Sequence, residues 1–160
     1  MTNAHLHHHS PHGSAHQSIR NPLAADRLGV VGETLIVYPW FDAVVDATGH
    51  PVCGDYVEQF WLGVLGPTAT WLARRLVNGF DHYPDGYELN LPDTAAALGV
   101  TFRTDKECPF TRALERLTLF GLARTYSYGL AVRTRAPLLG ARQLQKLPAH
   151  LREAHRLWES

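Results

Sequence analysis

The stretch that decides the fold reads ELNLPDTAAALGV, from Glu88 to Val100. Its first residues alternate between polar and apolar, which is the pattern of a strand with one buried face. Pro92 and Asp93 then open a small alanine-rich helix, because proline fits the first turn of a helix, and Gly99 supplies its stop. We therefore predict a strand that leads directly into a helix.

A second helix and a hairpin follow. Pro109 restarts the chain as a helix, and Gly121 ends it. The buried stripe of this helix is predicted at Phe110, Ala113, Leu114, Leu117 and Phe120. Two alternating runs, 122–126 and 130–134, surround a tight turn in which Gly129 can take a positive φ. The order of strand, helix, turn, helix and hairpin predicts a winged helix-turn-helix, in an α+β fold that is mainly α.

Two apolar stripes at helical spacing precede this module. The first consists of Val57, Phe60, Trp61, Val64 and Leu65, and the second of Ala69, Leu72, Ala73, Leu76, Val77 and Phe80. Asp55 is the expected N-cap of the first helix, with Glu58 closing a capping box. Pro67 begins the second helix, and we interpret both stripes as core. A short strand at Thr34–Tyr38 is expected to end at Pro39.

The chain divides into four predicted regions. These are a His-rich tail at 1–18, an N-terminal extension at 19–54 that packs on the domain, a winged-helix domain at 55–136 and a C-terminal helical segment at 137–160. The tail is expected to be disordered, with only adventitious metal affinity. The C-terminal segment is predicted to form one helix, or two helices divided at Pro148. The apolar side of this segment could dock on its own domain or pair with a second copy of the chain. We favour a homodimer.

Length and composition restrict the class of protein. A chain of 160 residues with 45% hydrophobic residues suits one globular domain and argues against global disorder. Its longest apolar stretches fall well short of the roughly 20 residues that span a bilayer. No basic start followed by an apolar block marks a secretory signal. We expect a cytoplasmic protein with no membrane partner.

The net charge of zero hides an asymmetry along the chain. Residues 1–100 contain four Arg or Lys against ten Asp or Glu, whereas residues 101–160 contain eleven against five. The two parts therefore carry −6 and +6. The basic part coincides with the predicted recognition helix, at about 109–120, and wing, at about 122–135. This is where a nucleic acid would bind.

We therefore predict a DNA-binding regulator of transcription, and double-stranded DNA as its partner. Guanidinium groups can clamp phosphate or hydrogen-bond two acceptors of guanine at once. On the recognition helix, Thr111, Arg112, Glu115 and Arg116 are expected to face outward. Arg103 and Lys106 flank its start. Arg124, Arg133 and Arg135 would be the phosphate contacts of the wing. The full set of candidate DNA-binding residues is Arg103, Lys106, Thr111, Arg112, Glu115, Arg116, Arg124, Arg133 and Arg135.

Other classes of function stay open. A winged helix can also serve as a protein-interaction adaptor without direct DNA binding, which the zero net charge would suit. A redox- or metal-responsive switch could use the histidines or the two cysteines, Cys53 and Cys108, which we expect to be free thiols in a reducing cytosol. The common nucleotide, hydrolase and metalloprotease motifs are absent from the sequence, so we expect no enzyme, no cofactor and no resident metal.

The chain from about Tyr38 to Trp158 resembles bacterial winged-helix transcriptional regulators of high-GC Gram-positive type. The resemblance rests on residues 38–41 (YPWF), 57–67 (VEQFWLGVLGP), 109–114 (PFTRAL), 121–123 (GLA) and 147–148 (LP). It implies sequence-specific DNA binding in transcription control, with possible contact to the transcription machinery. It implies no catalytic residues.

Overall fold

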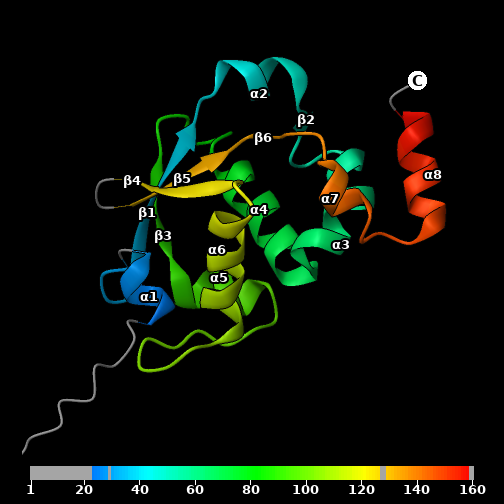
Figure 1. The fold of residues 1–160 in the computed structure, drawn as a ribbon. Coiled ribbons are helices and arrows are strands. Elements are labelled where there is room, and N and C mark those ends of the chain that lie inside the picture. The colour runs from blue at the N-terminus through cyan, green and yellow to red at the C-terminus, as the bar shows by residue number, and fades with distance from the viewer. Residues whose placement is uncertain (1–22, 29, 127–128, 159–160) are drawn as a thin grey trace, which may run out of the picture.

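The computed structural model describes residues 23–28, 30–126 and 129–158, and shows an α+β fold (Figure 1). In chain order the elements are α1 (Ala24–Arg27), β1 (Thr34–Trp40), α2 (Ala43–Thr48), β2 (His50–Pro51), η1 (Val57–Trp61), α3 (Leu62–Leu65), α4 (Pro67–Gly79), β3 (Tyr87–Asn90), α5 (Leu91–Ala97), α6 (Pro109–Leu119), β4 (Ala123–Tyr126), β5 (Gly129–Arg133), β6 (Arg135–Ala136), α7 (Ala141–Leu144) and α8 (Ala149–Trp158). The His-rich tail predicted at 1–18 lies outside the described residues.

The main sheet has four strands in the order β3-β1-β5-β4. Strand β1 is antiparallel to β3, with Leu35 opposite Leu89, and parallel to β5, with Val37 opposite Leu130. The sequence predicted only that residues 19–54 form an extension that packs on the domain, whereas the structure shows that this region supplies an inner strand of the main sheet. Leu35 and Val37 are buried in alternation with less buried neighbours, as an inner strand with one covered face requires.

Strand β1 also runs through Pro39 to Trp40 instead of ending at Pro39. The pairing with β3 stops at Val37, whereas the pairing with β5 continues to Trp40. From Tyr38 onward β1 is thus an edge strand on the β3 side. Proline is tolerated at an edge because its missing N–H removes no ladder hydrogen bond there.

Helices α4 and α6 cover one face of the sheet, and the core lies between them and the strands (Figure 1). The predicted apolar stripes of α4 and α6 are confirmed: Leu72 and Leu76 of α4 and Leu114 and Leu117 of α6 are all completely buried. Tyr87 of β3 reaches into this layer, where its hydroxyl donates to the carbonyl of Leu76 at 2.7 Å. Burial raises the pKa of Tyr87 to about 12.

The first helical segment begins differently from the prediction. Residues Val57–Trp61 form a π-helix, and no capping hydrogen bond from Asp55 is found at its start. Tyr56, Val57, Phe60 and Trp61 are each no more than 1% exposed. These residues follow an i, i+1, i+4, i+5 spacing, so they share one side of the helical segment, and that side faces the core.

The C-terminal segment forms two helices, α7 and α8, with Pro148 between them. They lie at the end of the molecule away from the sheet (Figure 1). Helix α8 docks on its own chain: His155 is 3% exposed, and its Nε2 lies 2.7 Å from the hydroxyl of Tyr56. The ring of Trp158 packs against Tyr56 and Phe60, with centroids 5.9 and 5.8 Å apart.

Candidate nucleic-acid interface

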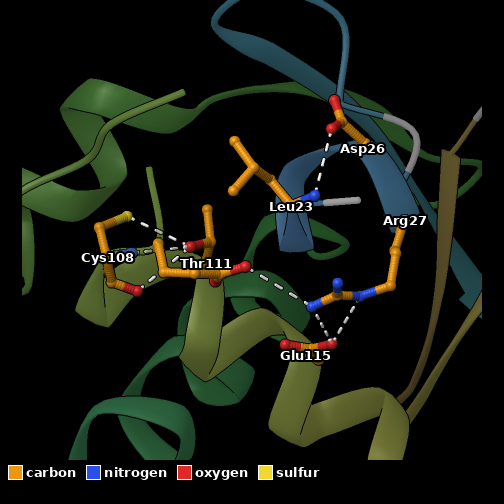
Figure 2. Close-up of polar contacts among 7 residues, drawn as sticks. Leu23, Asp26, Arg27, Cys108, Thr111 and Glu115 are labelled. Atoms are coloured by element: carbon orange, nitrogen blue, oxygen red, sulfur yellow. Dashed lines mark hydrogen bonds and ion pairs between the residues drawn. The ribbon is translucent and has the colours of Figure 1, made fainter. Parts of the chain in front are cut away.

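The predicted recognition helix exists as α6, but Thr111 does not face outward. Thr111 is 1% exposed and closes the start of the helix against Cys108 (Figure 2). The Cys108 amide donates to Thr111 Oγ1 at 3.3 Å, and the hydroxyl donates to the Cys108 carbonyl at 3.1 Å. The prediction of Thr111 as a DNA contact is therefore wrong. Its hydroxyl accepts from the Cys108 N–H, which the helix leaves unpaired, and gives a second donor to the Cys108 carbonyl, which also accepts from the Arg112 N–H.

The two arginines of α6 have different roles. The guanidinium of Arg116 donates to the carbonyls of Leu65 and Val64, both at 2.7 Å, and lies 5.3 Å from the ring of Phe120. It thereby satisfies carbonyls that the end of α3 leaves without helical partners. The side chain of Arg112 is exposed, and no hydrogen bond or ion pair joins this side chain to another described residue. Of this predicted pair, Arg112 is the cation available to a ligand.

Glu115 belongs to an ion pair with α1. Its carboxylate lies 2.6 Å from Nη2 of Arg27 and accepts a hydrogen bond from Nε at 2.8 Å (Figure 2). Helix α1 therefore rests on the side of α6 where Glu115 was expected to contact DNA. In the loop before α6, Arg103 is held by two hydrogen bonds to Asp105, at 2.9 and 2.8 Å. Lys106 in the same loop is exposed.

The arginines of the predicted wing are mostly used inside the fold. Arg135 donates to the carbonyl of Gly49 from Nε and Nη2, at 3.1 and 2.6 Å. Arg133 donates from Nε to the carbonyl of Gly121 at 2.9 Å, and its Nη1 forms an ion pair with Asp42 at 3.2 Å. Arg124 alone of the three is exposed. The prediction of Arg133 and Arg135 as phosphate contacts is corrected, because both guanidinium groups brace the backbone of neighbouring turns.

The structure instead joins α6 to residues of α4 and α5 through three adjoining surface hollows. The first, of about 290 Å³, contains Arg112 and Arg116; the second, of about 350 Å³, contains Trp71 and Arg75; the third, of about 470 Å³, extends along α4. The first two share Pro67 and Thr68, and the last two share Trp71 and Arg75. We call this continuous surface the helical groove. Its polar and aromatic lining residues are Cys53, Thr68, Trp71, Arg74, Arg75, Asn78, His82, Arg112 and Arg116.

The residues that line the helical groove carry a net positive charge. None of the described residues that line its three hollows is acidic, whereas four are arginines. The side chain of Arg75 is exposed and, like that of Arg112, forms no hydrogen bond or ion pair with another described residue. Arg74 pairs with Glu58 at 3.5 Å and lies 5.3 Å from the ring of Trp71. Helix α4 also begins in the groove, so its N-terminal partial charge adds to the field.

Sequence reasoning missed Arg74, Arg75 and Trp71 as site residues. Helical spacing places Arg74 and Arg75 opposite the apolar stripe of α4, so the exposure of Arg75 was predictable. Spacing within one helix cannot show which other helix lies beside an exposed face. The hollow that Arg75 lines adjoins the hollow that Arg112 lines, at Pro67 and Thr68, only when α4 packs against α6.

Both cysteines are free thiols. Cys53 is half-buried and donates to Oδ1 of Asn78 at 3.2 Å, and burial raises the pKa of its thiol. Cys108 is buried; burial alone would raise its pKa, but hydrogen bonds with Thr111 and neighbouring backbone groups lower it. In the described part of the chain, no cluster of three His, Cys, Asp or Glu is positioned to hold a metal.

Comparison with known proteins finds no matching family model, no matching curated protein and no matching solved structure. The resemblance to winged-helix regulators therefore stays a prediction. Within residues 23–28, 30–126 and 129–158, no helix has the length and apolar character needed to cross a membrane.

Proposed function

We propose that this chain is a winged-helix DNA-binding regulator of transcription, and that its helical groove receives the phosphate backbone of duplex DNA. The observation that carries the proposal is a continuous groove whose described lining residues include four arginines and no acid. Phosphates attract such a surface at long range and are held there by guanidinium groups. We assign no catalytic step to the chain, and the proposed setting is the cytoplasm.

The order of elements supports this proposal. From α4 to β5 the chain forms helix, strand, helix, helix and hairpin, as a winged helix does, with β1 as an added strand inside the sheet. One feature departs from a compact helix-turn-helix, in which a turn of roughly three to four residues joins the two helices. Here residues 98–108 form a longer loop between α5 and α6. This loop carries Arg103 and Lys106 to the N-terminal end of α6.

The residues of the groove receive separate roles. Arg112 and Arg75, which are exposed, contact phosphates. Arg116 positions α6 by holding the end of α3, so it is a positioning residue. Trp71, 58% exposed at the junction of two hollows, packs against a sugar or a base at the edge of the site. Arg124 lies on the other face of the sheet and does not take part.

The test is fluorescence anisotropy of a labelled random duplex, titrated with the full chain at several salt concentrations. We expect binding that weakens steeply with salt, because bound phosphates release counterions. Arg112→Ala and Arg75→Ala should each reduce the log-log salt slope by about 1 and weaken binding by about tenfold at low salt. The matched control is Arg142→Ala, an exposed arginine of α7 that does not line the groove.

Three outcomes would decide against the proposal or refine it. Absence of duplex binding at low salt would overturn it. Equal losses in Arg142→Ala and Arg112→Ala would show that any surface cation suffices and would overturn the assignment of the groove. Tighter binding of a single-stranded oligonucleotide than of the duplex would replace the duplex as the partner. Sedimentation of the complex at saturating DNA also tests the expected homodimer, which binds with two chains per site.

A further inference from the structure

A second surface of different chemistry lies on the sheet face that α4 and α6 leave uncovered. Along β1 this face carries Tyr38 and Trp40, and along β4 it carries Arg124 and Tyr126, since the register pairs Ala131 of β5 with both Tyr38 and Arg124, and Gly129 with Tyr126. Between them lies β5, where Gly129 and Ala131 are small. A hollow of about 370 Å³ results. We call it the aromatic groove; it is lined by Tyr38, Pro39, Trp40, Phe41, Asp85, Arg124, Tyr126 and Ala131.

The rings of the aromatic groove are held in place by their neighbours. Tyr38 meets Tyr126 edge to face, with centroids 6.1 Å apart. A Cβ at Gly129 would come within 2.9 Å of the ring of Tyr38, so this position needs glycine for the ring to lie against β5. The ring of Trp40 is braced by Arg133, whose guanidinium carbon lies 3.6 Å from its centroid, and by Arg124 at 4.4 Å. The groove is therefore preformed.

Two of its aromatic side chains are nevertheless left open to solvent. Phe41 is 75% exposed and Tyr126 is 55% exposed. Phe41 follows directly after the end of β1, and Tyr126 is the last residue of β4. The strand register places Tyr126 level with Ile36, whereas Phe41 lies just beyond Trp40, so the two exposed rings lie toward opposite ends of the hollow that both line, with Tyr38 between them. Exposed aromatic side chains gathered on one hollow mark an interaction site more often than single exposed residues do.

The charges of the aromatic groove exclude a phosphate backbone as its best ligand. Its lining has one acid, Asp85, and one base, Arg124. Arg133, beneath Trp40, is offset by Asp42 at 3.2 Å. No excess positive charge is left, in contrast to the helical groove. Asp85 is exposed and no ion pair joins it to a described residue, so its carboxylate is available to a cation on the ligand.

From this chemistry we propose that the aromatic groove binds an extended, proline-rich peptide that carries a basic side chain. Proline rings in a polyproline II helix pack between aromatic side chains, and the helix loses little entropy on binding because proline is already restricted. Tyr38, Tyr126 and Phe41 receive the prolines. The basic side chain of the peptide pairs with Asp85. This site is independent of the proposed DNA contact, because the two grooves share no residue.

Fluorescence anisotropy with defined peptides tests the proposal on the full chain. The probes are a labelled oligoproline that contains one arginine, the same peptide with glutamate in place of arginine, and a glycine-serine peptide that retains the arginine. We expect the first to bind most tightly and the other two to bind at least about fivefold more weakly, which is roughly the loss of one important contact. Tyr126→Ala and Phe41→Ala should weaken the first peptide to a similar extent.

Matched variants give each part of the proposal its own outcome. Tyr83→Ala removes a tyrosine that is 60% exposed outside the groove, and it should leave peptide binding unchanged. Asp85→Asn should abolish the preference for arginine over glutamate while proline-dependent binding persists. Arg112→Ala should lower DNA affinity and leave peptide affinity unchanged, so failure of one site is distinguishable from failure of the other.

The overturning results are equally specific. Absence of binding for all three peptides would overturn the proposal, as would a glycine-serine peptide that binds as well as the oligoproline. Binding of a single-stranded oligonucleotide that is lost in Tyr126→Ala but kept in Arg112→Ala would assign the aromatic groove to nucleic acid instead.

Discussion

The helical groove and the aromatic groove both contain arginines, yet they use them in opposite ways. In the helical groove, the side chains of Arg75 and Arg112 project to solvent without a partner among the described residues. Beneath the aromatic groove, Arg133 is paired with Asp42 and stacked on Trp40. One surface therefore attracts anions, whereas the other presents rings that its arginines hold in position.

This contrast shows that the count of arginines along a chain is a weak guide to a binding surface. Residues 101–160 contain the excess of basic residues, and all of the predicted contacts were chosen from this part of the chain. Arg116 and Arg135 of that set donate to backbone carbonyls within the fold. Arg75, which belongs to the acidic part of the chain, lies in the positive groove. The partners of each guanidinium decide its role.

The largest expected effect separates the two arginines of α6. Arg116→Ala should lower the free energy of unfolding by about 1.5 kcal/mol or more, because two carbonyls at the end of α3 lose charged donors. Arg112→Ala should change it by no more than about 0.5 kcal/mol, as is usual for an exposed side chain. Urea unfolding of both variants is the measurement. Equal stability of the two would show that Arg116 is not a positioning residue.

Thr111 gives the next largest effect and tests the corrected orientation. Thr111→Val should cost about 1 kcal/mol of stability, because the Cys108 amide loses its acceptor and the Cys108 carbonyl loses one of its two donors. Thr111→Ser, which keeps the hydroxyl, is the matched control and should cost less. DNA affinity, measured where both variants are fully folded, should not change. A large loss of affinity in Thr111→Val at unchanged stability would restore Thr111 as a contact.

A variant of Glu115 tests whether the negative charge beside Arg112 weakens DNA binding. Glu115→Gln should change stability by less than about 1 kcal/mol, because the Arg27 pair is partly exposed. It should modestly strengthen DNA binding at low salt, since it removes a negative charge beside Arg112. Glu153→Gln is the control, because it breaks the exposed Glu153–Arg156 pair on α8, away from the groove. Equal changes in DNA affinity for the two variants would contradict the local explanation.

The smallest expected effect concerns Asp42, which pairs with Arg133 beneath the aromatic groove. The backbone N–H of Val45, followed by Arg133, lowers the pKa of Asp42 below its usual value. A carboxyl with a lowered folded-state pKa contributes stability above its unfolded pKa and loses it as pH falls through the folded pKa. Thermal unfolding of Asp42→Asn, whose amide can still cap α2, should therefore depend less on pH at the acid end than that of the unmodified chain. Parallel acid profiles would show that Asp42 contributes nothing there.

Much of the fold follows from local spacing. The stripes of α4 and α6, the two alternating strands of the hairpin and the helix that follows β3 all lie where the sequence predicts them. Gly66 and Gly121, at helix ends, have φ angles of 82° and 74°, which glycine adopts without strain. These features depend on residues close to one another in the chain, so their pattern is visible in a linear reading.

The candidate site follows from the sequence only in part. Arg112 was predicted as exposed and is exposed, but Trp71 and Arg75, which line the adjoining hollow, come from a helix more than thirty residues earlier in the chain. The role of β1 was missed for a similar reason. A strand pattern reports which side chains are buried and gives no information about which strands flank it.

The sequence by itself thus determined α4, α5 and α6, most of β1, β3, β4 and β5, and the turns and buried apolar side chains that go with them. Helix and strand periodicity and the backbone preferences of proline and glycine act over a few residues, and they suffice for this. The sequence did not predict α1, α2, β2 or β6. Only the tertiary structure decided that β1 enters the sheet between β3 and β5 and that Thr111 turns inward. It also decided that Arg116 and Arg133 bind backbone carbonyls within the fold, whereas the side chains of Arg75 and Arg112 have no partner among the described residues. Hydrogen bonds, ion pairs and ring contacts between distant segments fix these outcomes, and their energies depend on distances that exist only after the layers have packed.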